Sequence, residues 1–134
     1  MTKNIFRAIV IVSIVLLLVA IVVLVFFNQP LPPELDSFVE ADLEADFTVI
    51  DYFGYTSALF AVAANIGLLF FARWSRPVFA AGVVATTIVT AFSGPFVATA
   101  LEAFVYEVGL LLDGFIIALA YFSEARVYFE QKAT

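Results

Sequence analysis

Cysteine and histidine are both absent from this chain of 134 residues. Without cysteine the chain has no disulfide, no thiolate metal site and no thiol for lipoprotein lipidation. Without histidine it lacks the commonest general base and the commonest transition-metal ligand. An enzyme built from this sequence would have to rely on carboxylates, tyrosines and hydroxyl groups. We therefore expect a protein that is not an enzyme, with no catalytic residue, no metal site and no cofactor.

Charged side chains are scarce, and basic ones are the scarcest. The chain has 6 lysines and arginines against 12 acids, for a net charge of −6. It is 64% hydrophobic, with a mean hydropathy of +1.10, whereas soluble domains are nearer half apolar. Six dispersed basic residues do not form a nucleic-acid groove. The composition predicts an all-α membrane protein whose first partner is the lipid bilayer, because a lone strand in lipid leaves its backbone unpaired.

Long apolar runs divide the chain into four spans of about the 20 residues that cross a hydrocarbon core. The expected spans cover residues 6–27, 52–72, 78–93 and 97–123. The first run resembles a secretory signal because Lys3 and Arg7 precede it, but it is long for one and no small-residue cleavage site follows. We interpret it as a retained anchor. The prediction is one membrane domain over residues 1–134, folded as a four-transmembrane-helix bundle.

The basic residues predict the orientation of the bundle. They precede the first run, separate the second from the third, and follow the last: Lys3, Arg7, Arg73, Arg76, Arg126 and Lys132. Between the first and second runs there is neither lysine nor arginine. Because cytoplasmic loops retain lysine and arginine, both termini are expected in the cytoplasm. Residues 28–51 are then periplasmic or external, and the protein lies in the cell inner membrane.

The external segment 28–51 is strongly acidic. Its candidate partner-docking residues are Glu34, Asp36, Glu40, Asp42, Glu44 and Asp46. The segment is either a solvated linker or a short amphipathic helix held on the membrane surface by Phe38 and Leu43. It lacks the glycine turn and ligand spacing of an EF-hand loop, so calcium binding is not expected. Asp51 is expected to cap the start of the second span.

Small residues recur at spacings of three and four in the second and third spans. In the second span they are Gly54, Ser57, Ala58, Ala61, Ala64 and Asn65, and in the third Gly82, Thr86 and Thr90. Small faces let two membrane helices approach closely. The two spans are therefore predicted to form the tightest hairpin of the bundle, joined by a short inside turn at residues 73–77.

Asp113 is the one ionisable residue predicted near the centre of the bilayer. It lies eleven residues before Glu124, which is about 16 Å at helical rise. A charged side chain at that depth costs roughly 2.5–3.5 kcal/mol on insertion scales. Asp113 is therefore expected to face the bundle and to have hydrogen-bonding partners.

Depth and helix face together give the candidate partners of Asp113. Thr86 lies ten residues from Arg76, so it is nearly at the same height, and Thr87 and Asn65 are close to it. At 100° per residue, two further side chains share its helix face. The candidate intramembrane polar site comprises Asp113, Thr86, Thr87, Asn65, Glu102 and Tyr106. Three roles remain open for Asp113: a hydrogen bond between helices, contact with a basic residue of a partner, or ion or proton coupling.

Two segments carry a resemblance to a known group. Residues 71–77, Phe-Ala-Arg-Trp-Ser-Arg-Pro, and residues 112–124, Leu-Asp-Gly-Phe-Ile-Ile-Ala-Leu-Ala-Tyr-Phe-Ser-Glu, resemble segments of small uncharacterised bacterial inner-membrane proteins with four spans. In that group a Trp/Arg inside turn precedes the third span, and a Gly-x-x-x-Ala-Leu-x-Tyr-Phe-Ser stretch closes the last. The resemblance covers the C-terminal half. It implies a four-span topology and a bacterial plasma membrane, and it implies no activity.

Two functions follow from these observations. The first is a non-enzymatic accessory, inhibitory or immunity-type subunit that binds another protein, favoured by the small-residue faces and the acidic segment. The alternative is an ion- or proton-coupled transporter or channel that uses Asp113. Four spans with one central acid rarely enclose a complete pathway, so the alternative requires a homo-oligomer.

Overall fold

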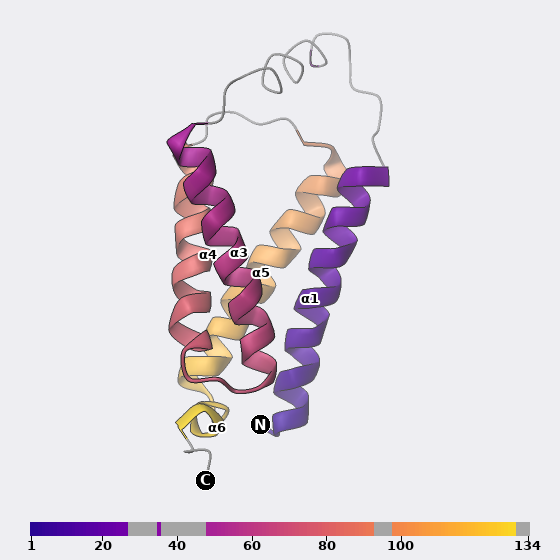
Figure 1. Ribbon diagram of the computed structural model, residues 1–134. Coiled ribbons are helices and arrows are strands. Elements are labelled where there is room, and N and C mark those ends of the chain that lie inside the picture. Colours follow the sequence, from indigo (N-terminus) through magenta and orange to yellow (C-terminus); the bar gives the residue numbers. More distant parts are fainter. Residues whose placement is uncertain (27–34, 36–47, 93–97, 131–134) are drawn as a thin grey trace.

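The computed structural model describes residues 1–26, 35, 48–92 and 98–130, and five helices can be bounded within these ranges (Figure 1). The helices are α1 (Lys3–Phe26), α3 (Val49–Leu69), α4 (Ser75–Phe92), α5 (Ala100–Phe122) and α6 (Arg126–Glu130). No strand occurs among the described residues. Four of the helices are long and apolar enough to cross a membrane, so the prediction of an all-α protein with four such helices is confirmed. The acids Glu34, Asp36, Glu40, Asp42, Glu44 and Asp46 lie outside the described residues.

The ends of α3 and α5 show what begins and ends these helices. Asp51 is the third residue of α3, so it lies within the first turn of the helix and not at the position that precedes it. The hydroxyl of Thr99 accepts a hydrogen bond from the Glu102 amide at 3.3 Å, and the Glu102 carboxylate accepts one from the Thr99 amide at 2.7 Å. This capping box satisfies two amides that a helix start leaves unpaired. At the other end of α5, the extended Ser123 stops the helix.

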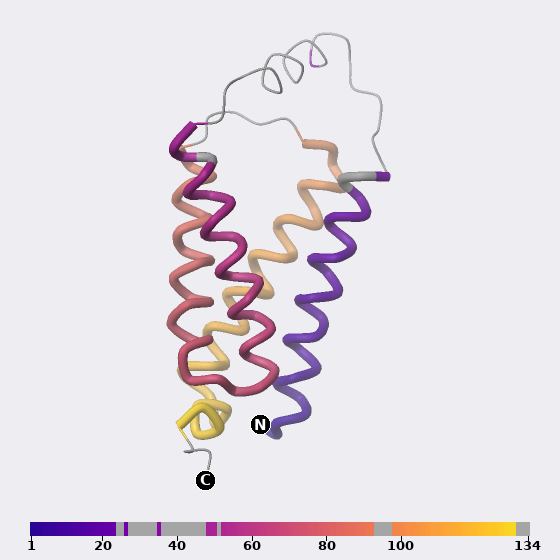
Figure 2. The backbone as a smooth tube through the Cα atoms, viewed as in Figure 1, coloured from indigo at the N-terminus to yellow at the C-terminus, as the bar shows by residue number. Residues whose placement is uncertain are grey.

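Helices α3 and α4 form the most closely packed pair, as the small residues predict (Figure 2). A Cβ atom built on Gly82 would lie 2.9 Å from the Cβ of Ala61 and 3.1 Å from its Cα. One built on Gly54 would lie 3.0 Å from Cγ1 of Val89. Glycine at these positions therefore allows the two backbones to approach. Helices α1 and α5 form a second pair beside this hairpin.

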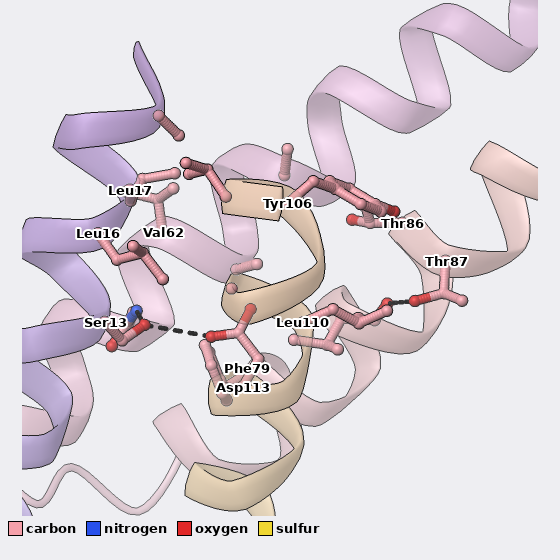
Figure 3. A pocket seen from close by; sticks show the side chains of 17 residues that line it. Ser13, Leu16, Leu17, Val62, Phe79, Thr86, Thr87, Tyr106, Leu110 and Asp113 are labelled. Carbon is pink, nitrogen blue, oxygen red and sulfur yellow. Dashed lines mark hydrogen bonds between the residues drawn. The ribbon is translucent and has the colours of Figure 1, made fainter. Parts of the chain in front are cut away.

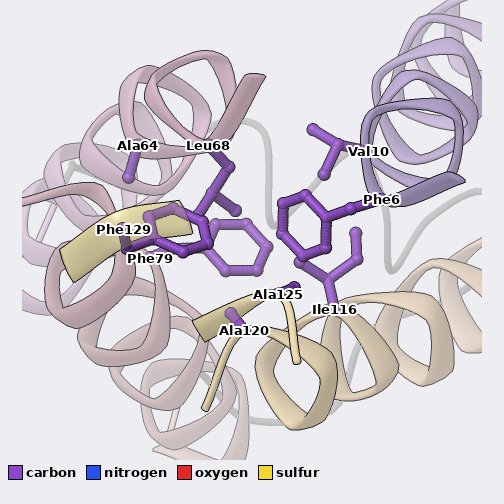
Figure 4. Close-up of a cluster of buried hydrophobic side chains, with 9 residues drawn as sticks. All are labelled: Phe6, Val10, Ala64, Leu68, Phe79, Ile116, Ala120, Ala125 and Phe129. Atoms are coloured by element: carbon purple, nitrogen blue, oxygen red, sulfur yellow. The ribbon is translucent and has the colours of Figure 1, made fainter. Parts of the chain in front are cut away.

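All the helices meet at the end of the bundle that holds the chain's N-terminus and α6. Nine buried apolar side chains form this base cluster: Phe6, Val10, Ala64, Leu68, Phe79, Ile116, Ala120, Ala125 and Phe129 (Figure 4). Phe71, in the turn after α3, has a φ of 54° and places its ring 5.6 Å from Phe6 and 5.2 Å from Phe129. Tilted and edge-to-face ring contacts of this kind add to the stability that burial alone supplies.

Three arginines close the same end by binding the last carbonyls of neighbouring helices. Arg7 Nε donates to Leu69 O at 3.0 Å, Arg76 Nη1 to Ala120 O at 3.2 Å, and Arg73 Nη2 to Glu130 O at 2.6 Å. A cation at a helix C-terminus is stabilised by the helix dipole and satisfies an unpaired carbonyl. Lys3 and Arg126 lie at this end too, so all basic side chains of the described residues gather there.

The two helix pairs diverge away from the base. Figure 1 shows the α3–α4 hairpin on one side and α1 on the other, with α5 crossing behind from the base of the hairpin to the far end of α1. The α1–α5 pair and the α3–α4 pair therefore pack against each other most closely at the base. The cavity described next is lined by residues of both pairs.

Candidate functional site

A cavity of about 240 Å³ lies between the α1–α5 pair and the α3–α4 hairpin (Figure 3). Its walls are mainly leucine, valine and alanine side chains from all four long helices. Ser13 and Asp113 lie at the end of the cavity nearer the base, beside Phe79, and Asn65 is hydrogen-bonded to Ser13 there. Thr86, Thr87 and Tyr106 are its other polar lining residues. The cavity is therefore mainly apolar, and its hydrogen-bonded polar groups from three helices lie at one end.

A chain of hydrogen bonds joins three helices at this polar end. Asn65 Nδ2 of α3 donates to Ser13 Oγ of α1 at 3.0 Å, and Ser13 Oγ donates to Asp113 Oδ1 of α5 at 3.1 Å (Figure 3). Ser13 and Asn65 are 7% and 5% exposed. A hydroxyl both donates and accepts, which is why serine can stand between an amide and a carboxylate. Ser13 is thus the centre of the polar site.

The polar site has acceptors that nothing in the described part of the chain satisfies. Asn65 Oδ1 is buried and has no hydrogen-bond partner. Asp113 Oδ2 receives no hydrogen bond from a described residue, and no lysine or arginine lines the cavity. A buried acceptor without a partner costs about 1–3 kcal/mol. The site therefore has a deficit of donors and of positive charge.

Local sequence explains how α5 presents Asp113 to α1. Gly109 lies one turn before Asp113 on the same helix face. A Cβ atom built on Gly109 would lie 3.9 Å from Cδ2 of Leu16, so this face is packed against α1. The hydroxyl of Ser13, one turn before Leu17, then comes within hydrogen-bonding distance of the carboxylate.

The structure gathers most of the predicted polar residues but changes their roles. Thr86 and Thr87 line the cavity, yet their hydroxyls donate to Gly82 O at 2.9 Å and Val83 O at 2.8 Å. The prediction that they donate to Asp113 is wrong, because a threonine inside a helix readily donates to its own carbonyl four residues back. Asn65 reaches Asp113 only through Ser13.

Of the two remaining predicted site residues, Tyr106 lines the cavity and Glu102 does not. Tyr106 lines the cavity two turns from Asp113, as the shared helix face predicts. Glu102 does not line it, because its carboxylate accepts from the Thr99 amide at the start of α5.

Ser13 was missed as a site residue by reasoning from the sequence alone. A signal for it was present: Ser13 is ten residues from Lys3, a height of about 15 Å that matches the eleven residues between Asp113 and Glu124. The same depth matching that selected Asn65 would have selected Ser13.

The side chains that line the cavity offer hydrogen bonding and one carboxylate. Among the residues that the structure describes, no group of acids could hold a metal ion. The cavity has a single carboxylate, an amide, three hydroxyl-bearing aliphatic side chains and a phenol. In comparisons with protein-family models, with curated proteins and with solved structures, nothing matches this chain.

Proposed function

We propose that the chain crosses the inner membrane of a bacterium four times and acts as a non-enzymatic accessory subunit that binds another membrane protein. Membrane insertion is supported by apolar side chains on the outer surface, where Leu59 is 71% exposed and Leu111 is 75% exposed. Such a surface is unfavourable in water over so large an area. Both termini are assigned to the cytoplasm, because the described basic side chains gather at the end of the bundle that holds α6.

The observation that carries the proposal is the donor-deficient polar end of the cavity. Among the described residues, Asn65 Oδ1 has no hydrogen-bond partner and Asp113 has only the hydroxyl of Ser13. In water such acceptors would be hydrated, but a hydrocarbon core supplies no donors. A membrane protein that brought a donor to the cavity would satisfy them. The unfinished hydrogen bonding therefore favours a bound state with a second protein over a free bundle.

The test is the composition of the native particle. The protein is extracted from its own membranes with a mild detergent, and the particle's mass and components are measured. We expect a second, distinct protein in fixed stoichiometry. A particle that contains only this chain would contradict the proposal.

Crosslinking adds the location of the contact. A photoreactive amino acid at Leu110, which lines the cavity, should capture the second protein. The matched control is its neighbour Leu111, which is 75% exposed and does not line the cavity. Equal capture from both positions would mean that the partner binds elsewhere.

The inhibitory or immunity-type form of the proposal would use the acidic segment instead. Its residues lie outside the described part of the chain, so only their charge supports this form. Replacing the acids at 34, 36, 40, 42, 44 and 46 by their amides should release the partner if the segment docks it. An unchanged complex would leave the cavity as the contact.

A second candidate is a homo-oligomeric ion or proton pathway. It is favoured by the second oxygen of Asp113, which has no described donor and borders the cavity. Reconstituted protein should then conduct or transport an ion, and Asp113→Asn should abolish the flux. Flux that is unaffected by this substitution would exclude a required carboxylate.

A further inference from the structure

We infer that the cavity receives a lysine or arginine side chain from a transmembrane helix of the partner protein. The inference rests on the proposed accessory function and specifies the chemistry of its partner. It follows from three properties of the cavity. Two acceptor atoms lack a donor among the described residues, no basic side chain lines the cavity, and its size and mainly apolar walls suit one long side chain.

The unpaired polar atoms call for a donor. Asn65 Oδ1 and Asp113 Oδ2 are both acceptors. The hydroxyls of Thr86 and Thr87 do not serve them, because each donates to a carbonyl of its own helix. A lysine ammonium carries three N–H donors and an arginine guanidinium five, and neither has an acceptor that would need satisfying. A basic side chain is therefore the chemical complement of the site.

The missing charge points to a different protein rather than to a second copy of this one. The basic side chains of the described residues lie at the base, and three of them are bound to carbonyl groups there. Lys132 follows α6 in the sequence, beyond the four long helices. A second copy would offer its basic residues at the end of its bundle, whereas Asp113 lies about three turns inside α5. The counter-charge therefore comes from a helix that carries a basic residue within its span.

The shape of the cavity suits one long side chain. Its volume of about 240 Å³ is below the 300–1,000 Å³ typical of pockets for drug-sized ligands. A whole helix, about 10–12 Å across, would remain outside. Leu17 and Leu110 line the cavity and are 38% and 39% exposed, so it reaches the surface of the bundle. Lysine and arginine pack their aliphatic stems on apolar surface and place their charge in a polar region. This matches a mainly apolar cavity with hydrogen-bond acceptors at one end.

The test uses a synthetic transmembrane helix as the probe. The helix is rich in leucine and alanine and carries lysine, or the isosteric uncharged norleucine, at its centre. Binding to the full chain in liposomes is followed by energy transfer to a dye on Val127→Cys, which labels uniquely because the natural chain has no cysteine. We expect the lysine helix to bind at least tenfold more tightly than the norleucine helix.

Four variants connect this preference to the cavity. Asp113→Asn removes the charge with little change of shape and should reduce the preference to less than twofold. Leu110→Trp fills the cavity and leaves the carboxylate in place, so it should do the same even if Asp113→Asn disturbs folding. The matched controls, Leu111→Trp outside the cavity and Glu102→Gln at the start of α5, should retain the preference.

The failure of this inference is distinguishable from the failure of the proposed function. Equal binding of the lysine and norleucine helices to the natural chain would overturn the inference. So would a native partner whose helix, crosslinked at Leu110, carries no basic residue within its span, although the accessory function would then stand. A native particle without a second protein would contradict both the inference and the proposed accessory function.

Discussion

Gly82→Ala should weaken the α3–α4 hairpin, because one methyl group would meet the backbone of the facing helix. The new Cβ would lie 2.9 Å from the Cβ of Ala61, 3.1 Å from its Cα and 3.2 Å from its amide nitrogen. Carbon atoms pack best at about 3.5–4.0 Å, so the helices would have to separate locally by roughly 0.6–1.1 Å. The obstructing atoms belong to backbone and to a Cβ, and no rotamer change moves them away.

The expected magnitude follows from overpacking. An extra methyl in a tightly packed contact costs about 1–3 kcal/mol. Replacing glycine by alanine within a helix contributes up to about 1 kcal/mol in the opposite direction. That gain is reduced in a bilayer, because the separated spans remain helical there. A net loss of about 1–2 kcal/mol in the free energy of unfolding is expected.

The assay is reversible unfolding in mixed micelles of mild detergent and sodium dodecyl sulfate. Gly114→Ala is the matched control, because a Cβ at Gly114 would meet no heavy atom within 4 Å apart from its chain neighbours and the nearby backbone of its own helix. The control should be neutral or slightly more stable than the natural chain. If Gly82→Ala proved as stable as Gly114→Ala, the close approach of α3 and α4 would be refuted.

Three further predictions test other contacts. A double-mutant cycle of Ser13→Ala with Asp113→Asn should give a coupling energy of about 0.6 kcal/mol in the same unfolding assay, and no coupling would mean that their hydrogen bond does not form. Thr99→Ala should cost about 1 kcal/mol by removing the cap of α5, whereas Thr99→Ser should retain most of the stability. The hydrogen bond and charge of Arg126 hold the pKa of Glu130 below its ordinary value of 4.5, so Arg126→Gln should raise this pKa in a carboxyl NMR titration, and an unchanged value would exclude the pair. Because the folded-state pKa is lowered, the stabilisation by this pair is present above pH 4.5 and is lost as the pH falls through the lowered value.

The sequence predicts the helices and the hairpin well because both depend on local features. An uncharged run of about 20 residues in lipid must form a helix to pair its backbone. Close approach needs small side chains, so the spacing of Gly54 and Ala61 on one span and Gly82 on the next identifies the hairpin. Neither argument requires knowledge of how distant segments pack.

The polar site is less predictable because it depends on which way α1 faces. That helix is apolar on nearly all sides, and Ser13 is the only polar side chain between Arg7 and Phe26. Nothing in its pattern marks an inner face, so the packing against α5 decides the direction of Ser13. Thr86 and Thr87 line the same cavity as Asp113, as their predicted depth requires. Their hydroxyls nevertheless donate to carbonyls of their own helix and not to Asp113. Depth in a membrane can be counted from the sequence, but helix rotation is a property of the assembled bundle.

The base cluster has a consequence for the order in which the protein assembles. It joins the first helix to the last: the rings of Phe6 and Phe129 are 5.6 Å apart, and the hydroxyl of Tyr128 donates to the carbonyl of Met1 at 3.1 Å. During synthesis these contacts form only after α6 has been made, whereas the α3–α4 hairpin needs no later segment. Until α6 is made, the base contacts of α1 are limited to earlier segments, such as the hydrogen bond from Arg7 to Leu69 O and the ring contact of Phe6 with Phe71. In the order of synthesis, the hydroxyl of Ser13 gains Asn65 as a partner when α3 has been made and Asp113 only when α5 has been made, so the polar site is completed late.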